Sequence, residues 1–321
     1  IHKLHIARKR LENDFGLQVV VMPNALKGIE YLDEHPEARA SDLMDAFRDK
    51  EIKAIFNAIG GDDSIRLLPY IDFDVIRDNP KIFTGFSDTT SNHLMMYKAG
   101  LVSYYGASIM TNFAEYVKIN DYTLQMIRDT LFDPKPVLEI PSAPYWYDDE
   151  DEKIWWKEEN INRLRQYHPE GIGYEIVQGS GVVEGELLGG CIDVFIQLTG
   201  TPVWPTIDQW QGKIMFLETS EEDMSCDYLT WILRNLQAQG IFDAIKGILV
   251  GKPARRSKYE AYKYVYRKVV GKEAGHPEIP IMYNVNFGHA EPIGIIPYGL
   301  KCRLDADNRT LTLLEPATQN R

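Results

Sequence analysis

The sequence predicts an α/β protein in which a parallel sheet is covered by helices on both faces. Short apolar runs in the first third of the chain have the length and composition of buried strands; they are residues 17–22, 54–59 and 81–84. Segments with helical apolar spacing alternate with these runs, at residues 4–15, 41–49 and 89–98. This alternation is typical of parallel sheets, because a parallel connection needs a crossover, usually a helix.

The rest of the chain shows the same alternation. Its expected strands are 213–217, 247–250 and 279–283, its expected helices are 223–239 and 259–270, and an expected hairpin pairs 300–304 with 310–314. Prolines, clustered aromatic residues and an acidic run at 148–152 mark a connection that could act as a lid. A length of 321 residues suits about two domains of roughly 150 residues. We expect an N-terminal domain at 1–135, a linker at 136–175 and a C-terminal domain at 176–321.

Composition argues against several classes of partner. A formal net charge of −12 and a pI of about 5.1 do not suit a nucleic-acid-binding protein. The three cysteines are odd in number and widely spaced, which predicts neither a disulfide framework nor a cysteine zinc site and fits the reducing cytoplasm. No apolar run reaches the roughly 20 residues of a membrane span. Residues 1–10 have the pattern of the middle of a helix, so we expect an element before Ile1.

The sequence around Ser87 has most of the pattern of a nucleophile elbow. Ser87 follows an apolar strand and Gly85 and precedes a helix, so its hydroxyl would project from the sheet beside the free N–H groups of the helix start. Thr89 stands where the elbow pattern has a further glycine, so the match is partial. A helix N-cap also explains a serine here, and this fragment alone favours the cap.

Two glycines follow the preceding strand. Gly60 and Gly61 expose backbone N–H groups that could bind a phosphate or an oxyanion, and an ordinary turn explains them as well. The sequence contains no G-x-G-x-x-G, Walker or H-E-x-x-H pattern. The motifs therefore predict neither a nucleotide cofactor nor a metal ion.

Two further strand ends carry residues suited to catalysis. Glu218 directly follows an apolar strand, and His289 follows another strand and Gly288. Ligands of α/β proteins gather at the carboxyl ends of strands, so Ser87, Glu218 and His289 could form a triad. Each also has an ordinary explanation, because an acid complements a helix start and a histidine can lie in any loop.

Five segments, in order, resemble the LD-carboxypeptidases and the related microcin C immunity proteins, a family of serine peptidases. They are residues 57–64 with 67–72 (NAIGGDDS and LLPYID), 79–90 (NPKIFTGFSDTT), 184–191 (EGELLGGC), 216–220 (FLETS) and 287–292 (FGHAEP). The resemblance covers about residues 54–299. It implies an N-terminal flavodoxin-like domain, a smaller C-terminal α/β domain and a site between them. It also implies a homodimer without cofactor or metal.

The resemblance also assigns roles to residues. It implies a triad of Ser87, His289 and Glu218, with an oxyanion hole formed by backbone N–H groups of Gly61, Asp62 and Asp88. His289 would take the serine proton as Ser87 attacks an amide, and an acyl-enzyme would follow. A base of ordinary histidine character would lose activity as the pH drops through roughly 6 to 7. Gly60 is expected beside the substrate.

The linker favours the immunity-protein subgroup. Trp155 and Trp156 resemble its tryptophan-bearing loop, and an indole can stack on a nucleobase. Adjacent side chains of an extended segment point in opposite directions, so one tryptophan should contact substrate and the other should pack on protein. Alignment with the immunity-protein loop favours Trp156 as the stacking residue. Alternatively, both only pack the lid or a dimer contact.

The expected function is therefore hydrolysis of the amide bond in a peptidyl or aminoacyl nucleotide. The alternative within the family is a muramoyltetrapeptide carboxypeptidase acting on small peptides of peptidoglycan recycling. Two other classes remain open. One is a non-catalytic ligand-binding module with the same fold, against which the complete residue set argues. The other is an α/β-hydrolase esterase, against which the position of the acid and histidine beyond a linker argues.

Overall fold

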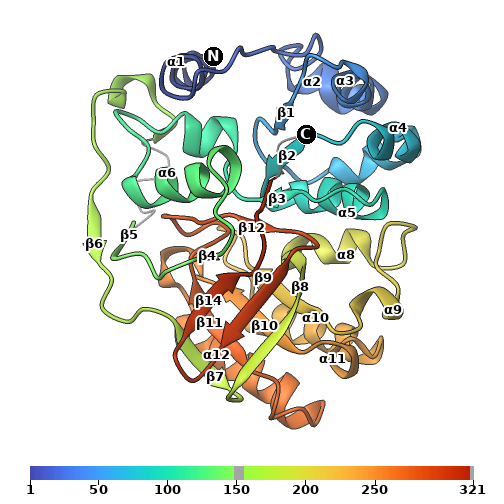
Figure 1. Cartoon of the computed structure of the whole chain (residues 1–321), viewed down its shortest axis with the longest axis vertical. Coiled ribbons are helices and arrows are strands. Elements are labelled where there is room, and N and C mark those ends of the chain that lie inside the picture. The colour runs from blue at the N-terminus through green and yellow to red at the C-terminus, as the bar shows by residue number, and fades with distance from the viewer. Residues whose placement is uncertain (148–154, 319–321) are drawn as a thin grey trace.

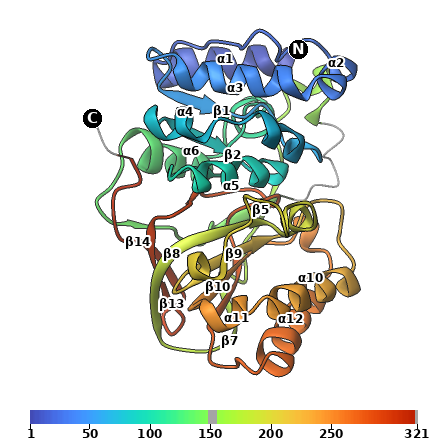
Figure 2. The same ribbon diagram turned by 90° about the vertical axis from the view of Figure 1, so that its right-hand side faces the viewer.

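The computed structural model of the chain describes residues 1–147 and 155–318. Two sheets, each with its own helices, are stacked on one another, with the N-terminal half above the C-terminal half (Figures 1 and 2). The acidic run at 148–152 and Ile154 lie outside the described residues. Among the described residues, no helix is long and apolar enough to cross a membrane.

The N-terminal half is built on a four-stranded sheet with the order β1-β2-β3-β12. Its first three strands are parallel, and β12 pairs antiparallel with β3. The strands are β1 (Ala54–Phe56), β2 (Ile82–Gly85), β3 (Tyr104–Tyr105) and β12 (Ile296–Pro297). The helical elements are α1 (His2–Phe15), α2 (Ile29–Glu34), α3 (Pro36–Arg48), η1 (Ser64–Tyr70), α4 (Phe73–Asp78), η2 (Ser87–Thr89), α5 (Thr90–Lys98), η3 (Ile109–Phe113), α6 (Asp121–Ile127) and η4 (Arg128–Phe132).

Helices cover both faces of this sheet, as the alternating strands and helices predict. Successive strand residues point to opposite faces, so Phe83 packs into a core with α3, α4 and α5, while Ile82 packs against a second core with α1 and α6. The two faces carry separate hydrophobic clusters, and β2 lies between them with its carboxyl end toward the C-terminal half (Figure 1). This position places the residues after β2 at the junction of the two halves.

The C-terminal half is built on an eight-stranded sheet with the order β4-β14-β13-β8-β9-β10-β11-β7. Its centre, β8 to β11, is parallel, and the flanking strands pair antiparallel. The strands are β4 (Leu138–Glu139), β7 (Glu175–Gln178), β8 (Val182–Cys191), β9 (Ile214–Glu218), β10 (Gly247–Gly251), β11 (Ile281–Val285), β13 (Lys301–Asp305) and β14 (Thr310–Leu313). The helical elements are η7 (Ile192–Val194), α8 (Phe195–Leu198), α9 (Ile207–Trp210), α10 (Cys226–Ala238), α11 (Ile241–Ala244), η8 (Ala254–Arg256), α12 (Tyr259–Tyr266) and η9 (Arg267–Glu273).

The two halves exchange strands. β4, from the expected linker, joins the C-terminal sheet, and β12, from the C-terminal half, completes the N-terminal sheet. The remainder of the linker contains a two-stranded ribbon, β5 (Tyr145–Tyr147) with β6 (Tyr167–Pro169), and a short helix, η6 (Glu158–Asn160). The chain therefore passes between the two sheets more than once.

Most of the predicted elements are confirmed, but the strand at residues 17–22 is wrong. Within the described residues this segment pairs with no strand and has no regular structure, and Val20 is 60% exposed. An apolar, β-branched run becomes a strand only where a neighbouring strand accepts its hydrogen bonds, and residue composition does not supply that neighbour. The predicted hairpin near the C-terminus is confirmed as β13 and β14.

Candidate active site

Ser87 lies in the backbone conformation of an elbow. It follows the end of β2, begins η2 and has a φ of 64°, which a residue with a side chain rarely adopts. Such a conformation costs about 1–3 kcal/mol and persists where the surroundings enforce it. The Ser87 N–H donates to the Tyr105 hydroxyl at 3.0 Å. At Gly85 a Cβ would lie 2.8 Å from Thr89 Cγ2, so the tight turn requires glycine there.

The glycine turn after β1 packs directly on the elbow. A Cβ at Gly60 would lie 2.7 Å from Ser87 Cβ, so only glycine allows this approach. The backbone N–H groups of Gly61 and Asp62 donate to no hydrogen bond within the described residues. The buried Asp88 carboxylate accepts from the N–H groups of residues 63 and 64, at 3.0 and 2.8 Å. The Asp88 side chain thus fixes the turn next to the serine, a role that sequence reasoning did not assign to it.

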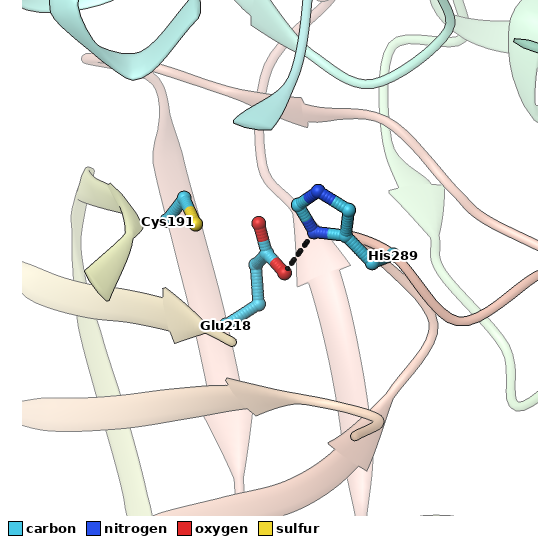
Figure 3. A group of neighbouring side chains, drawn as sticks. All are labelled: Cys191, Glu218 and His289. Atoms are coloured by element: carbon cyan, nitrogen blue, oxygen red, sulfur yellow. Dashed lines mark hydrogen bonds and ion pairs between the residues drawn. The ribbon is translucent and has the colours of Figure 1, made fainter. Parts of the chain in front are cut away.

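Glu218 and His289 form a hydrogen-bonded pair at the carboxyl ends of β9 and β11. His289 Nδ1 lies 2.7 Å from Glu218 Oε2 (Figure 3). The Tyr105 hydroxyl donates to Oε1 of the same carboxylate. Glu218 is fully buried. A Cβ at Gly288 would lie 2.6 Å from the Glu218 carboxylate, so glycine at that position lets the two side chains meet. Tyr105 therefore connects the Ser87 backbone to the acid.

The outer nitrogen of His289 faces a second acid. Nε2 lies 3.2 Å from Glu221 Oε2, and the Phe86 ring packs edge-on against the imidazole at a centroid distance of 5.1 Å. Phe86 precedes Ser87, so this contact brings the elbow and the imidazole together. Within the described residues, Ser87 Oγ makes no hydrogen bond to His289.

The charges around His289 raise the pKa of its imidazole. Burial alone lowers this pKa, but the carboxylates of Glu218 and Glu221, with a further contribution from Asp193, outweigh burial and raise it to about 9. The expectation of an ordinary histidine that titrates between about pH 6 and 7 is therefore wrong. The reason is that two acids face its two ring nitrogens.

Models of two family domains match most of the chain. The LD-carboxypeptidase N-terminal domain matches residues 1–106, and the LD-carboxypeptidase C-terminal domain matches residues 184–304. The chain belongs to the LD-carboxypeptidase family. The resemblance of the five sequence segments is thereby confirmed at the level of the family.

The relatives of this chain include both a microcin immunity protein and carboxypeptidases. The chain is 29% identical to the microcin C7 self-immunity protein MccF of Escherichia coli, over 86% of this chain and 78% of MccF. It is also 29% identical to a probable murein peptide carboxypeptidase of Bacillus subtilis, over 97% of this chain and 86% of that protein. An MccF-like protein from Streptococcus pneumoniae, solved in complex with AMP, superimposes with a TM-score of 0.88 at 33% identity, covering 97% of this chain and 93% of that one.

In this LD-carboxypeptidase family member, a buried cysteine lies beside the acid. Cys191 pairs in register with Glu218 across β8 and β9, and its N–H donates to Thr90 Oγ1 at 3.0 Å. One donor atom each of Cys191, Glu218 and His289 lies within 4.8 Å of the others, a spacing that could hold a metal ion (Figure 3). Burial raises the pKa of the Cys191 thiol well above its usual value, so the sulfur stays protonated. Both oxygens of the Glu218 carboxylate already form hydrogen bonds, one with Tyr105 and one with His289.

The two linker tryptophans of this family member have different environments. Trp155 is 6% exposed and packs edge-on against Tyr116 at a centroid distance of 5.7 Å. Trp156 is 38% exposed, with the Lys3 ammonium 5.2 Å from its ring centroid. One indole is thus buried in protein while its neighbour keeps an accessible face.

Sequence reasoning missed three residues that surround the triad candidates. Tyr105 ends a two-residue strand, Cys191 ends β8, and Glu221 lies in the loop after β9. Tyr105 and Cys191 each end a strand next to one that carries a triad candidate, and that shared position is the signal that could have indicated them. Glu221 has no such signal, because neighbouring acids share its loop.

Proposed function

We propose that this protein is a serine peptidase that hydrolyses the amide bond of aminoacyl or peptidyl nucleotides. The observation that carries the proposal is the strained elbow at Ser87 beside a buried Glu218–His289 pair. A left-handed serine at a strand end and an imidazole oriented by a carboxylate are the parts that nucleophilic catalysis needs. We also infer a homodimer in the cytoplasm, as the family resemblance and the cysteine pattern imply.

In the proposed mechanism His289 Nε2 removes the Ser87 proton as Oγ attacks the amide carbonyl. The Glu218 carboxylate holds Nδ1–H and stabilises the imidazolium that forms. Backbone N–H groups of Gly61, Asp62 and Asp88 bind the oxyanion of the tetrahedral intermediate. His289 then protonates the leaving nitrogen, and water attacks the acyl-enzyme to release the acid and regenerate the serine.

Two observations favour a nucleotide-bearing substrate. A relative of 33% identity was solved with AMP bound, and the exposed face of Trp156 offers a surface for a nucleobase. The alternative, a murein peptide carboxypeptidase, is favoured by the relative of that name. The deciding experiment compares kcat/KM for an aminoacyl sulfamoyl adenylate with that for a muropeptide ending in D-alanine. Higher kcat/KM for the muropeptide would reverse the proposal, and failure of a serine-directed phosphonate to label the protein would indicate a binding module.

The activity of the free enzyme should increase up to an unusually high pH. Since the pKa of His289 is raised to about 9 and the base must be neutral, kcat/KM should rise about tenfold per pH unit from pH 6 and level off near pH 9. The measurement is kcat/KM from pH 6 to 10 on an amide substrate with chemistry rate-limiting. The rate of phosphonate labelling should follow the same curve. A plateau already reached at pH 7 would contradict the assignment of His289 as this base.

Replacing Trp156 by alanine should weaken nucleotide substrates selectively. Loss of one base–indole stack costs about 1–3 kcal/mol, which corresponds to an increase in KM of about 5- to 150-fold for the sulfamoyl adenylate. A muropeptide has no aromatic face, so its KM should stay within about twofold. Trp231→Ala, which removes a 61% exposed indole from α10, is the matched control. Equal losses on both substrates would mean that the loop is only a structural lid.

A further inference from the structure

The imidazole nitrogen that would accept the Ser87 proton already has a partner. His289 Nε2 lies 3.2 Å from Glu221 Oε2, while Nδ1 lies 2.7 Å from Glu218 Oε2. Nδ1 is hydrogen-bonded to Glu218, and Nε2 lies within ion-pair distance of Glu221. Two carboxylates this close to the ring favour the protonated imidazole over the neutral one. An imidazolium has no lone pair for the serine proton. The Glu221 contact thus favours the form of the imidazole that cannot act as a general base.

The other groups around the imidazole do not replace Glu221. Glu218 and the Cys191 thiol lie on the inner side, and Asp193 adds its charge from a greater distance. Asp193 is occupied, because it accepts from the N–H and hydroxyl of Ser220 at 3.0 and 2.9 Å. Within residues 1–147 and 155–318, His289 is the only cationic partner of Glu221. The Glu221 side chain is 38% exposed, so its carboxylate can bind a second cation from solvent.

Glu221 also faces a cavity next to the triad candidates. Ser220, Asp223, Arg255 and Tyr262 are among the residues that line this cavity. Its other acid, Asp223, is held by the Lys258 ammonium at 2.6 Å. Of the two carboxylates that line this cavity, Glu221 is therefore the one paired with the His289 imidazole. A cationic ligand that binds the Glu221 carboxylate would therefore change the protonation state of His289.

We propose that Glu221 binds the ammonium group of the substrate's acyl portion and thereby releases His289 Nε2 for catalysis. The inference rests on the proposed function and adds the substrate class: acyl groups with a free amine next to the scissile carbonyl. Ser87 Oγ must lie within about 3–3.5 Å of the carbonyl carbon and within hydrogen-bond reach of the base, so a carboxylate in contact with the base lies on the side of the site where the groups attached to that carbon are bound. When the ammonium takes over Glu221, the Nε2 proton leaves to water, and Nε2 can then accept the proton of Ser87.

The test compares a sulfamoyl adenylate that has a free α-amine with its N-acetyl derivative, on wild type, Glu221→Gln and the control Glu222→Gln. Wild type and the control should prefer the free amine by about tenfold or more in kcat/KM, and Glu221→Gln should lose the preference. Between about pH 5.5 and 7.5, kcat of Glu221→Gln on the N-acetyl substrate, which carries no ammonium group, should exceed that of wild type, because more of the variant's His289 is neutral. A preference that survives in Glu221→Gln would overturn the proposal.

A second readout needs no turnover. NMR titration of the His289 imidazole should give a pKa lower by about one unit or more in Glu221→Gln than in wild type. In a Ser87→Ala background the free-amine ligand should lower this pKa, and the N-acetyl ligand should not. An unchanged pKa in Glu221→Gln would refute the role of Glu221. If wild type hydrolysed neither substrate, the proposed function would be contradicted instead. The NMR titration alone would then test whether Glu221 controls the pKa of His289.

Discussion

Replacing Ser87 by alanine is expected to lower kcat by about 10⁴- to 10⁶-fold, because nucleophile and base act as a unit. The fold should survive, since the hydroxyl is small and the turn is held by other groups, including Tyr105 and the Asp88 carboxylate. Ser87→Gly should lose the same activity and gain about 1 kcal/mol of stability, because glycine adopts a φ of 64° without strain. The measurements are single-turnover hydrolysis and urea unfolding of both variants.

A nearby serine supplies the matched control. Ser91 is buried on α5, and its Oγ has no hydrogen-bond partner within the described residues. Removing such a hydroxyl is close to neutral for stability, so Ser91→Ala should keep activity within about threefold and should still be labelled by a serine-directed phosphonate. Ser87→Ala with more than a tenth of the parent activity would refute Ser87 as the nucleophile.

The second large effect is expected at Glu170, a buried acid that joins the linker to the end of β10. Its side chain is 3% exposed and lies 2.5 Å from the Lys252 ammonium, itself 1% exposed, and it also accepts from the Arg256 guanidinium. The Trp146 ring of β5 covers that guanidinium at 4.4 Å. Burial raises the pKa of Glu170, but the hydrogen bonds from the two cations outweigh burial and hold this pKa at about 2.

Glu170→Gln should destabilise the protein by about 3–5 kcal/mol at pH 7, because Lys252 is left buried without its anion. Glu170 has a depressed pKa in the folded state, so its contribution is complete above the unfolded value of about 4.3 and is lost as the pH falls toward 2. The difference in unfolding free energy between wild type and variant should therefore shrink below about pH 4. Urea denaturation at pH 7 and pH 3 measures it.

The controls for Glu170 separate charge pairing from a general surface effect. Glu260→Gln removes an acid that is 80% exposed and pairs with Lys263, and should change stability by less than about 0.5 kcal/mol. Adding Lys252→Met to Glu170→Gln removes the unpaired charge and should restore part of the loss. A loss below about 1 kcal/mol in Glu170→Gln alone would show that the buried pair is not a principal contact between linker and sheet.

The positions of Ser87, Glu218 and His289 were predictable because strand ends are visible in sequence. A buried strand is a short apolar run, and the polar residue after it lies at a known edge of the sheet. In the structure Glu218 and His289 lie together, and Phe86 links the elbow to the imidazole. The same logic failed for residues 17–22, since pairing depends on a neighbouring strand that local composition does not report.

The electrostatic character of the site could not be predicted from sequence. The pKa of His289 depends on Glu218 and Glu221, whose distances from the imidazole are set by glycines, loop path and packing. Ion pairs between residues far apart in the chain, such as Glu170 with Lys252, have no sequence signature either, because many acids and bases are available. Spacing indicates which side chains reach a sheet edge, but not which of them are in contact.

The exchange of β12 between the halves has a consequence for how the site responds to motion. His289 lies between β11, which belongs to the C-terminal sheet, and β12, which belongs to the N-terminal sheet. Its segment is therefore anchored at both ends to bodies that would separate if the halves moved apart. Any such displacement would change the position of the imidazole relative to both sheets. A chimaera of two relatives should accordingly take residues 286–297 and both flanking sheets from the same parent. A junction between the two parental sequences within this segment would shift the His289 imidazole.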